Sequence, residues 1–571
     1  MRANLFGAWR HTIAAATLLL ALTGAASAAT ITIINLDGAG EGFNDPTPAV
    51  PVGNNPATTI GAQRLYVFNY AAAIWGSLLP STVEIRINAR FDGQTCDAGG
   101  AVLGSAGAGS SHRNFANAPF TNTWYQQSLA NRIAGFDLNP SVSDVNITFN
   151  SNLCNPGCLF CWYYGVDGNE GSLVELLPVV FHELGHGLGF ATITLAGVQS
   201  GTPPGPHIYD RFLYDLDQGM HWHEMASDAQ RGASAVNCQR LAWDGECVKY
   251  VVPRRLGPRP LLRVGSPATV AGDYSVGMAN FGPQSFSVTG DLALGNDGTS
   301  LPNSPFNACE PLINGPDIAG KIAVVDRGTC SRAIKVKNCQ DAGAIAVVVV
   351  DTLPGCPAVG MSGYDPAIVI PSVQVMADDG NSIKAQLAAG VNATLMFDAA
   401  QTAGAVGDRA LVYTPTVFAT GSSVSHWDTS HQPNSLMEPF ITNSVSSGPD
   451  LAVPQLHDVG WFGTVPCATA LSVPGGVVNS SAHLDVPYPN PATRFVTLKF
   501  RISRPEYVRL SIVDVSGRVI RSLHDGMLPP GEHMNVWDGA GLSRKNVPPG
   551  VYMVNLRTSS GVQTHRLSIS R

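Results

Sequence analysis

The strongest constraint on this chain is a five-residue pattern, His182-Glu183-Leu184-Gly185-His186. The sequence predicts a helix from an N-cap at Ser172 to about Phe190, and Pro178 means that this helix is kinked there or begins later. Residues four apart lie on one face of a helix, so both imidazoles can bind a single metal ion. Zinc fits such a pair, and the glutamate beside it is placed to take a proton from zinc-bound water.

A catalytic zinc site needs a third protein ligand. Gly189 can end the helix in a left-handed conformation and turn the chain. Thr192 stands where many metzincins, a class of zinc proteases, carry their third histidine, so the compact form of that motif is absent. The third ligand must therefore come from elsewhere in the chain. Without one, the pattern is only a helix with two surface histidines.

Two later segments, Ser425-His-Trp427 and Ser435-Leu-Met-Glu-Pro439, extend the pattern. Together with the helix sequence they resemble the leishmanolysin-type metzincins, over roughly 30–247 and 412–463. The resemblance implies a metzincin-like catalytic domain, a twisted sheet plus helices. It also implies that His426 is the third zinc ligand and that Met437 lies in a Met-turn below the zinc. The alternative for Met437 is an ordinary core methionine.

Other residues compete for these roles. Glu224, in the sequence His221-Trp-His223-Glu224, would be the third ligand of a gluzincin-like site, which needs no Met-turn. We expect His431 and His457 to be solvated or structural histidines. The segment 209–212 (Tyr-Asp-Arg-Phe) could anchor groups around the metal ligands, although an ordinary buried salt bridge is favoured.

The region between these segments has its own pattern of buried strands and helices, with strands expected at 322–326 and 345–350 and a helix at 333–344. The sequences 317–330 and 335–344 resemble the protease-associated (PA) domain, a small α/β fold found in peptidases. The resemblance implies a lid or a substrate-recruiting surface, and an inert spacer is the alternative. An inserted domain accounts for the distance to His426.

The C-terminal region alternates apolar and polar residues in short runs, as at 508–513 and 551–556, which predicts a small β-sandwich. With Tyr488-Pro-Asn-Pro491 and Pro549-Gly-Val-Tyr552 it resembles the Ig-like C-terminal domains of bacterial secreted enzymes, of the hook-cap and type IX sorting kind. The resemblance implies a Gram-negative-type secreted protein and contact with outer-membrane secretion machinery.

In the first part of the chain we expect a short apolar strand at 31–34, a helix at 60–75 bounded by Thr58-Thr59, and alternating strands at 83–91 and 145–149. The predicted fold class is therefore a multidomain α+β protein. In chain order we expect a signal peptide at 1–28, a metzincin-like catalytic domain at 29–261, an inserted α/β PA domain at 262–405, the second part of the catalytic domain at 406–465, a linker at 466–484 and an Ig-like β-sandwich at 485–571.

Export permits disulfides, and the chain has 11 cysteines. Cys238 and Cys247 could close one small loop in the catalytic part, and Cys467 is the one expected to be left over. Two further groups are Cys309, Cys330, Cys339 and Cys356 in the insert and Cys96, Cys154, Cys158 and Cys161 in the catalytic part. Their pairing is open.

These features predict a secreted zinc endopeptidase with one catalytic Zn²⁺, held by His182, His186 and His426, and with Glu183 as the general base. The alternatives are a zinc aminopeptidase and a non-catalytic surface-binding protein with a vestigial site. We expect a monomer that acts on proteins or peptides. The net charge of −8 argues against nucleic acid as a partner. Calcium is compatible with an exported chain, but no pattern locates a site for it.

Overall fold

The computed structural model describes residues 28–97, 100–168, 170–171, 173–298, 304–363, 365–440, 450–467 and most of 482–570. Within that last range, 486, 488–489, 491, 493–494, 503–504, 515–517, 530, 542–545 and 559–560 are not described. Nearly all of the predicted signal peptide, most of the predicted linker, Ser172 and part of the motif at 488–491 therefore lie outside the described residues. Among those that are described, no helix has the length and apolarity needed to cross a bilayer.

The first domain of the chain, called the catalytic domain after its predicted role, begins with a four-stranded sheet in the order β1-β2-β6-β3. Its strands are β1 (Ile31–Asn35), β2 (Ile85–Asp92), β6 (Val145–Asn150) and β3 (Gly104–Ala108). The first three are parallel; β1 contains the apolar run predicted at 31–34, and β2 and β6 bury alternate residues, as predicted for 83–91 and 145–149. β3 is antiparallel to β6 and forms one edge of the sheet.

Two helices pack on this sheet, α1 (Ile60–Leu78) and α3 (Leu176–Leu188). Thr59 caps α1 by accepting a hydrogen bond from the backbone N–H of Ala62, at the boundary that the sequence predicted. α3 begins later than predicted, at Leu176 after an N-cap at Glu175. Pro178 therefore lies in the first turn, where a proline breaks no intrahelical hydrogen bond.

A second sheet joins chain segments from both sides of the insertion. Its order is β10-β9-β11-β20-β19, and β11 before the insertion pairs with β20 after it. These strands are β10 (Met220–His221), β9 (Leu213–Asp215), β11 (Leu241–Trp243), β20 (Arg409–Leu411) and β19 (Ala405–Val406). Helices α5 (Glu246–Arg255) and α9 (Ala452–Val459) also pack together across the insertion. One hydrophobic core therefore includes residues from both segments.

The remaining elements of this domain are short. They are β4 (Ser111–Arg113), β5 (Trp124–Gln126), α2 (Gln127–Ala134), β7 (Trp162–Tyr163), β8 (Val174–Glu175), α4 (Asp228–Ser234), and the 3-10 turns η1 (Gly42–Asn44), η2 (Tyr209–Arg211) and η3 (Trp222–Glu224).

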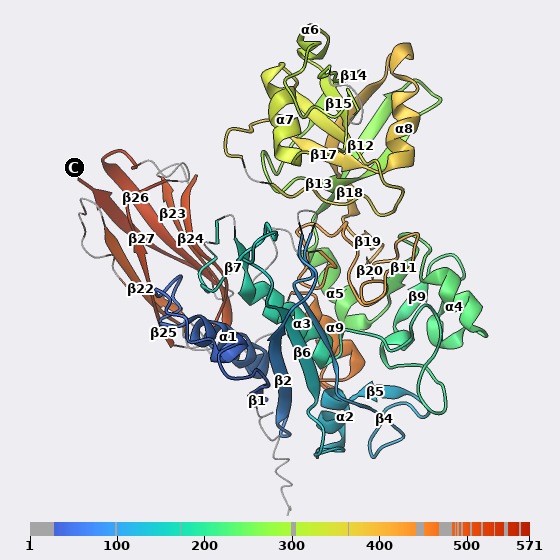
Figure 1. The fold of residues 1–571 in the computed structure, drawn as a ribbon, viewed down its shortest axis with the longest axis vertical. Helices are drawn as coiled ribbons and strands as arrows, with labels where there is room; N and C mark the ends of the chain where they lie inside the picture. Colours follow the sequence, from blue (N-terminus) through green and yellow to red (C-terminus); the bar gives the residue numbers. More distant parts are fainter. Residues whose placement is uncertain are drawn as a thin grey trace, which may run out of the picture.

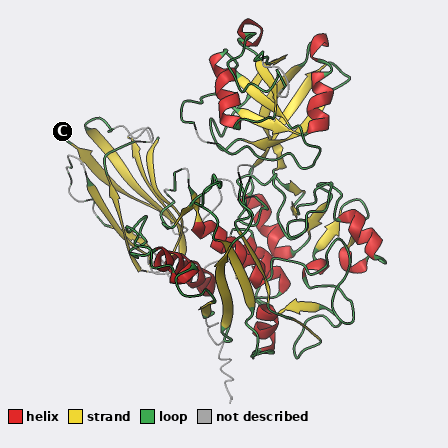
Figure 2. Ribbon diagram, in the orientation of Figure 1, coloured by secondary structure: helices red, strands yellow, loops and turns green. Residues whose placement is uncertain are grey.

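The insertion is a closed barrel in the order β12-β13-β17-β16-β15-β14-β18. The strands are β12 (Pro258–Ser266), β13 (Gly272–Met278), β14 (Val288–Leu294), β15 (Ile322–Asp326), β16 (Ala346–Val350), β17 (Ser372–Val375) and β18 (Asn392–Thr402). Helices α6 (Gly315–Ile318), α7 (Arg332–Asp341) and α8 (Ala377–Lys384) and the turn η4 (Leu387–Ala389) complete it, and Figure 2 shows helices on both sides of its strands. The first strand starts four residues before the predicted boundary at 262.

The C-terminal region forms two antiparallel sheets around one core, β21-β22-β25 and β24-β23-β26-β27. Their strands are β21 (Ala482–Leu484), β22 (Val496–Ile502), β23 (Glu506–Asp514), β24 (Val519–Leu528), β25 (Gly531–Trp537), β26 (Gly550–Thr558) and β27 (Gly561–Ile569). This is the predicted sandwich, although β21 begins within the segment predicted as linker.

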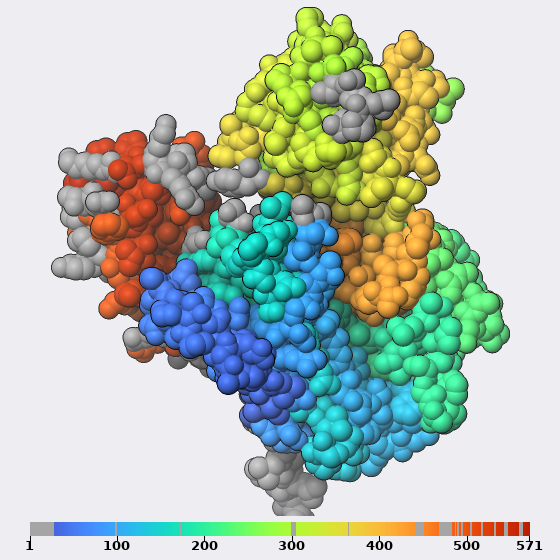
Figure 3. All heavy atoms as spheres, viewed as in Figure 1, coloured from blue at the N-terminus to red at the C-terminus, as the bar shows by residue number. Residues whose placement is uncertain are grey.

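The barrel and the sandwich lie on different sides of the catalytic domain (Figure 1). The sandwich lies beside α1, and Tyr70 of that helix packs against the sandwich core. The barrel sits over the segment that follows it in the chain, coloured orange in Figure 3.

Five disulfides correct the cysteine assignments made from sequence. They are Cys96–Cys158, Cys154–Cys161, Cys238–Cys356, Cys247–Cys467 and Cys309–Cys330. Cys238 and Cys247 do not pair with each other, because each reaches across the tertiary structure to a distant partner. The unpaired cysteine is Cys339, buried in α7, and not Cys467.

Candidate metal centre

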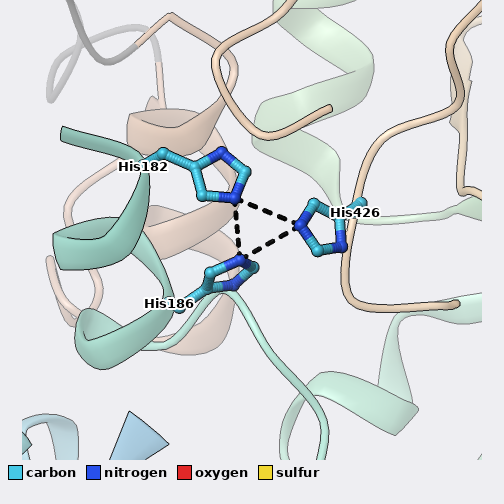
Figure 4. Close-up of side chains that lie close together, drawn as sticks. All are labelled: His182, His186 and His426. Carbon is cyan, nitrogen blue, oxygen red and sulfur yellow. Dashed lines mark hydrogen bonds between the residues drawn. The ribbon is translucent and has the colours of Figure 1, made fainter. Parts of the chain in front are cut away.

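Three imidazoles meet at the centre of the catalytic domain (Figure 4). His182 and His186 project from α3, one turn apart on the same face, as their spacing predicts. His426 comes from the segment after the insertion, and its ring nitrogen Nε2 lies 3.1 Å from that of His182 and 3.2 Å from that of His186. The remaining Nε2–Nε2 distance, between His182 and His186, is 3.0 Å.

Each ring is oriented by a backbone carbonyl. Nδ1 lies 2.7 Å from the Leu436 oxygen in His182, 2.8 Å from the Phe190 oxygen in His186 and 2.8 Å from the Ser422 oxygen in His426. A carbonyl oxygen only accepts, so each Nδ1 carries the hydrogen and donates it. Each Nε2 is then unprotonated, and the three lone pairs converge on one point.

The surroundings keep these imidazoles neutral. Burial lowers the pKa of His182 to about 4. Burial and the neighbouring imidazole of His182 together lower the pKa of His186 to about 3. Burial and the two neighbouring rings hold the pKa of His426 well below its usual range. Three unprotonated nitrogens with no hydrogen between them are a metal-binding set, and a tetrahedral zinc with bonds near 2.05 Å spaces its nitrogens by about 3.3 Å. The residues fit zinc.

Glu183 is the acid of the pattern and is only 5% exposed. Its Oε2 is buried and has no hydrogen-bond partner among the described residues. Burial raises the pKa of this carboxyl to about 8. The edge strand β3 passes close by, since a Cβ on Gly104 would lie 3.1 Å from Glu183 Oε1. The carboxyl therefore follows His182 directly along α3, and its Oε2 makes no hydrogen bond to another described residue.

Met437 packs against Gly185 of α3 and is fully buried. A Cβ on Gly185 would lie 2.7 Å from its sulfur, so glycine allows this close packing. The carbonyl of Met437 accepts a hydrogen bond from the Trp427 N–H at 2.8 Å. This bond ties the turn at 435–439 to the residue after His426.

The end of α3 is fixed by Gly189, as the sequence predicted, and by two contacts that the sequence did not reveal. Gly189 ends the helix at a φ of 133°, which only glycine adopts readily. The Trp461 indole donates to the Leu188 carbonyl at 2.7 Å. The ring of Phe190 packs on that of Trp427, with centroids 4.8 Å apart. These contacts hold the carbonyl that orients His186.

Asp210 is fully buried without a salt bridge among the described residues, so the favoured interpretation of 209–212 was wrong. It accepts hydrogen bonds from the hydroxyls of Thr192 and Thr194, both at 2.5 Å, and from the His207 N–H at 2.9 Å. The N–H of Thr192 in turn donates to the Ser425 hydroxyl at 3.3 Å. Asp210 therefore positions the loop after α3 against the residue preceding His426.

The rival ligands lie apart from this cluster. Glu224 is half-exposed and accepts a hydrogen bond from the His221 N–H, and His221 also contacts Asp244. His431 is buried and stacks on Trp427, and the His457 Nε2–H donates to the Val465 carbonyl at 2.7 Å. His431 is structural, and His457 makes only local contacts.

Close packing of α3 on the sheet predicts a large effect at Gly187. A Cβ there would lie 2.3 Å from Val145 Cγ1 on β6, and a β-branched side chain in a central strand cannot move away. We expect Gly187→Ala to lower the free energy of unfolding by about 1–3 kcal/mol, measured by chemical denaturation. Gly107→Ala is the control, because nothing lies within 4 Å of that Cβ position. Equal stability of the two variants would contradict the packing argument.

Two parts of the chain match known domain families. Residues 288–383 match the PA domain, and residues 487–570 match the secretion system C-terminal sorting domain. The predictions of these two domains are thereby confirmed. The chain is a multidomain α+β protein with a PA domain and a C-terminal β-rich sorting domain.

Curated relatives share only part of their length with this chain. ER degradation-enhancing alpha-mannosidase-like protein 3 of Xenopus laevis is 32% identical over 138 residues, which are 23% of this chain and 15% of that protein. The minor extracellular protease Vpr of Bacillus subtilis is 30% identical over 146 residues, which are 23% of this chain and 18% of that protein.

Similar solved structures also overlap only in part. An aminopeptidase from Aneurinibacillus sp. strain AM-1 is 24% identical with a TM-score of 0.19, covering 25% of this chain and 31% of that one. PorZ, a surface component of the type-IX secretion system of Porphyromonas gingivalis, is 21% identical with a TM-score of 0.13, covering 17% and 13%.

Proposed function

We propose that this protein is a secreted zinc endopeptidase of the leishmanolysin-like metzincin type with one catalytic Zn²⁺. The observation that carries the proposal is the convergence of three unprotonated Nε2 atoms, 3.0–3.2 Å apart, with the buried carboxyl of Glu183 beside them. His182, His186 and His426 would hold the ion. Met437 supports this assignment through its packing below α3.

Zinc, when bound, supplies a Lewis acid that makes water more acidic and polarises a peptide carbonyl. A divalent cation a few Å away also favours the carboxylate form of Glu183, against the effect of burial. The unpartnered Oε2 of Glu183 can then accept a proton from water and pass it to the leaving amine. The three histidines stay neutral and keep their Nε2 atoms free of hydrogen, because the carbonyls of Leu436, Phe190 and Ser422 hold the other nitrogen.

The edge strand β3 supports an endopeptidase over an aminopeptidase. Its sequence, Gly104-Ser-Ala-Gly-Ala108, carries only small side chains, and among the described strands it pairs on one side only, with β6. Its backbone can therefore pair with an extended peptide chain, and Gly104 places that chain beside Glu183. The described metal-ligand cluster consists of three histidines and contains no carboxylate, the kind of group that would hold a free terminal amine.

Cleavage of a blocked protein tests the proposal. We expect the zinc-loaded protein to cut a casein whose amines have been methylated, and a zinc chelator to stop the reaction. New internal termini would be identified by mass spectrometry. Release of single residues from unblocked peptides, with the blocked protein left intact, would favour the aminopeptidase. No chelator-sensitive cleavage of either substrate would favour a non-catalytic binding protein.

The C-terminal domain supports export as the setting of this activity. The match at 487–570 to a secretion sorting domain agrees with the predicted signal peptide and with five disulfides. We therefore place the protein outside the cell or on its surface, delivered by type IX-like outer-membrane machinery that recognises this domain. Its substrates would be proteins or peptides met there, cut by a monomer.

A further inference from the structure

A cavity of about 410 Å³ lies between the inserted barrel and the catalytic domain. The barrel contributes Asn280, Arg327 and Arg332, and the segment after His426 contributes Thr429, Gln432 and Glu438. The Cys238–Cys356 disulfide ties a loop of the barrel domain to the catalytic domain and so limits how far the two can separate. The volume is within the usual range for a ligand site.

Several buried polar atoms in this wall have no partner. Both side-chain atoms of the Asn280 amide, Nε of Arg332 and Oγ1 of Thr429 are enclosed and make no hydrogen bond within the described structure. Unsatisfied buried groups are rare in native proteins, and each costs about 1–3 kcal/mol. Their concentration around one cavity indicates an occupant that has both donors and acceptors.

The charged side chains that line the cavity indicate the charge of that occupant. Arg327 is paired with Asp351, at 3.0 and 3.2 Å. Arg332 has no acid within salt-bridge distance among the described residues, and burial together with Arg327 lowers the pKa of its guanidinium. Burial raises the pKa of Glu438 well above its usual range and so disfavours its charged form, and no ion pair joins it to Arg332 among the described residues. The Arg332 Nε is enclosed and the guanidinium is unpaired among the described residues, an arrangement that a negatively charged ligand would stabilise.

We propose that this cavity binds a peptide segment that carries a carboxylate, with the carboxylate on Arg332 and a backbone amide on Asn280. A guanidinium can form two parallel hydrogen bonds to the two oxygens of a carboxylate. The Asn280 side chain offers the donor and the acceptor that a peptide group needs. That this segment belongs to a protein substrate rests on the proposed function, whereas the binding itself does not.

The chain segment that lines this cavity also contributes to the metal centre. The stretch from His426 to Glu438 carries a zinc ligand, the Leu436 carbonyl that orients His182, and Met437, and its other side lines the cavity. Figure 3 shows the barrel packed directly over this part of the chain. A peptide bound here would therefore contact the segment that holds two of the three imidazoles.

Calorimetric titration of the full-length Glu183→Gln protein with capped hexapeptides tests the proposal, because this variant is not expected to cut them. The first probe has one central glutamate and an amidated C-terminus, and the second replaces glutamate by glutamine. The third is the glutamine peptide with a free C-terminal carboxylate. We expect about ten-fold or tighter binding of a carboxylate-bearing probe relative to the neutral one. The first and third probes distinguish a side-chain carboxylate from a terminal one.

Arg332→Gln in the same background is expected to weaken that binding by about ten-fold or more without lowering the melting temperature, since no described acid forms an ion pair with this arginine. Arg263→Gln is the control, because that arginine lies on the barrel surface, 44% exposed and paired with Asp273. Asn280→Ala provides a second variant and should weaken all bound probes. Equal affinity of all three probes, or unchanged binding in Arg332→Gln, would overturn the proposal. A protein that binds the probes but hydrolyses nothing in its wild-type form would contradict the proposed function only.

Discussion

Glu183→Gln is expected to lose peptide-bond hydrolysis by a factor of about 10²–10⁴ while the protein keeps its zinc. Glutamine has nearly the same size and shape as the glutamate that it replaces and is uncharged, which suits a buried position. The fold and the three imidazoles should therefore be unchanged. What is lost is the oxygen that accepts a proton, because an amide cannot act as a general base.

The measurement combines activity on the blocked protein with metal content determined by mass spectrometry. Glu224→Gln is the matched control, since that side chain is half-exposed and lies outside the metal cluster. Glu183→Ala should behave as the glutamine variant does. A fully active Glu183→Gln protein that binds zinc would refute the assignment of Glu183 as the base.

His426→Ala is expected to lose both zinc and activity. Loss of a group that merely orients a ligand weakens metal binding about 10–100-fold, so loss of one of three ligands should cost more than about 100-fold. The loss should show as release of zinc when a chelator buffers the free zinc at low nanomolar concentration. The imidazole is only 5% exposed, and alanine leaves a small void, so circular dichroism should check that the fold remains.

Glu224→Ala separates the two ligand hypotheses. Its zinc affinity should equal that of the unmodified protein, because Glu224 bonds to His221 and lies outside the cluster of three histidines. Retained zinc in His426→Ala with loss in Glu224→Ala would instead support the gluzincin-like site. His457→Ala should also keep its zinc, since that ring bonds to the Val465 carbonyl.

Most of the fold that could be predicted followed from the local periodicity of apolar residues. The strands at 31–34, 322–326 and 508–513 and the helix at 60–75 all lie within elements of the same type, because alternation and helical spacing are local properties. Element boundaries were less certain, as the later start of α3 shows. Closure of the insert into a barrel was not predicted, since strand order depends on contacts far apart in the sequence.

The metal centre could likewise be predicted only in part. The pairing of His182 with His186 follows from spacing within one helix, whereas His426 was proposed from family resemblance alone. The groups that orient the three rings are the backbone carbonyls of Leu436, Phe190 and Ser422, and a carbonyl leaves no signal in a sequence. The cysteine partners of Cys238 and Cys247 were missed for a related reason, because pairing depends on which surfaces the fold brings together.

Cys247 and Cys467 join the two halves of the catalytic domain on either side of the barrel. A protease that nicks the chain anywhere between them produces two fragments that remain one covalent particle until a reductant is added. Cys467 lies before the sandwich, so removal of the sorting domain leaves this bond intact and keeps the segment with His426 joined to the part of the chain that contains α3. The protein can thus lose the continuity of its backbone, or its last domain, and still keep all three imidazoles in one molecule.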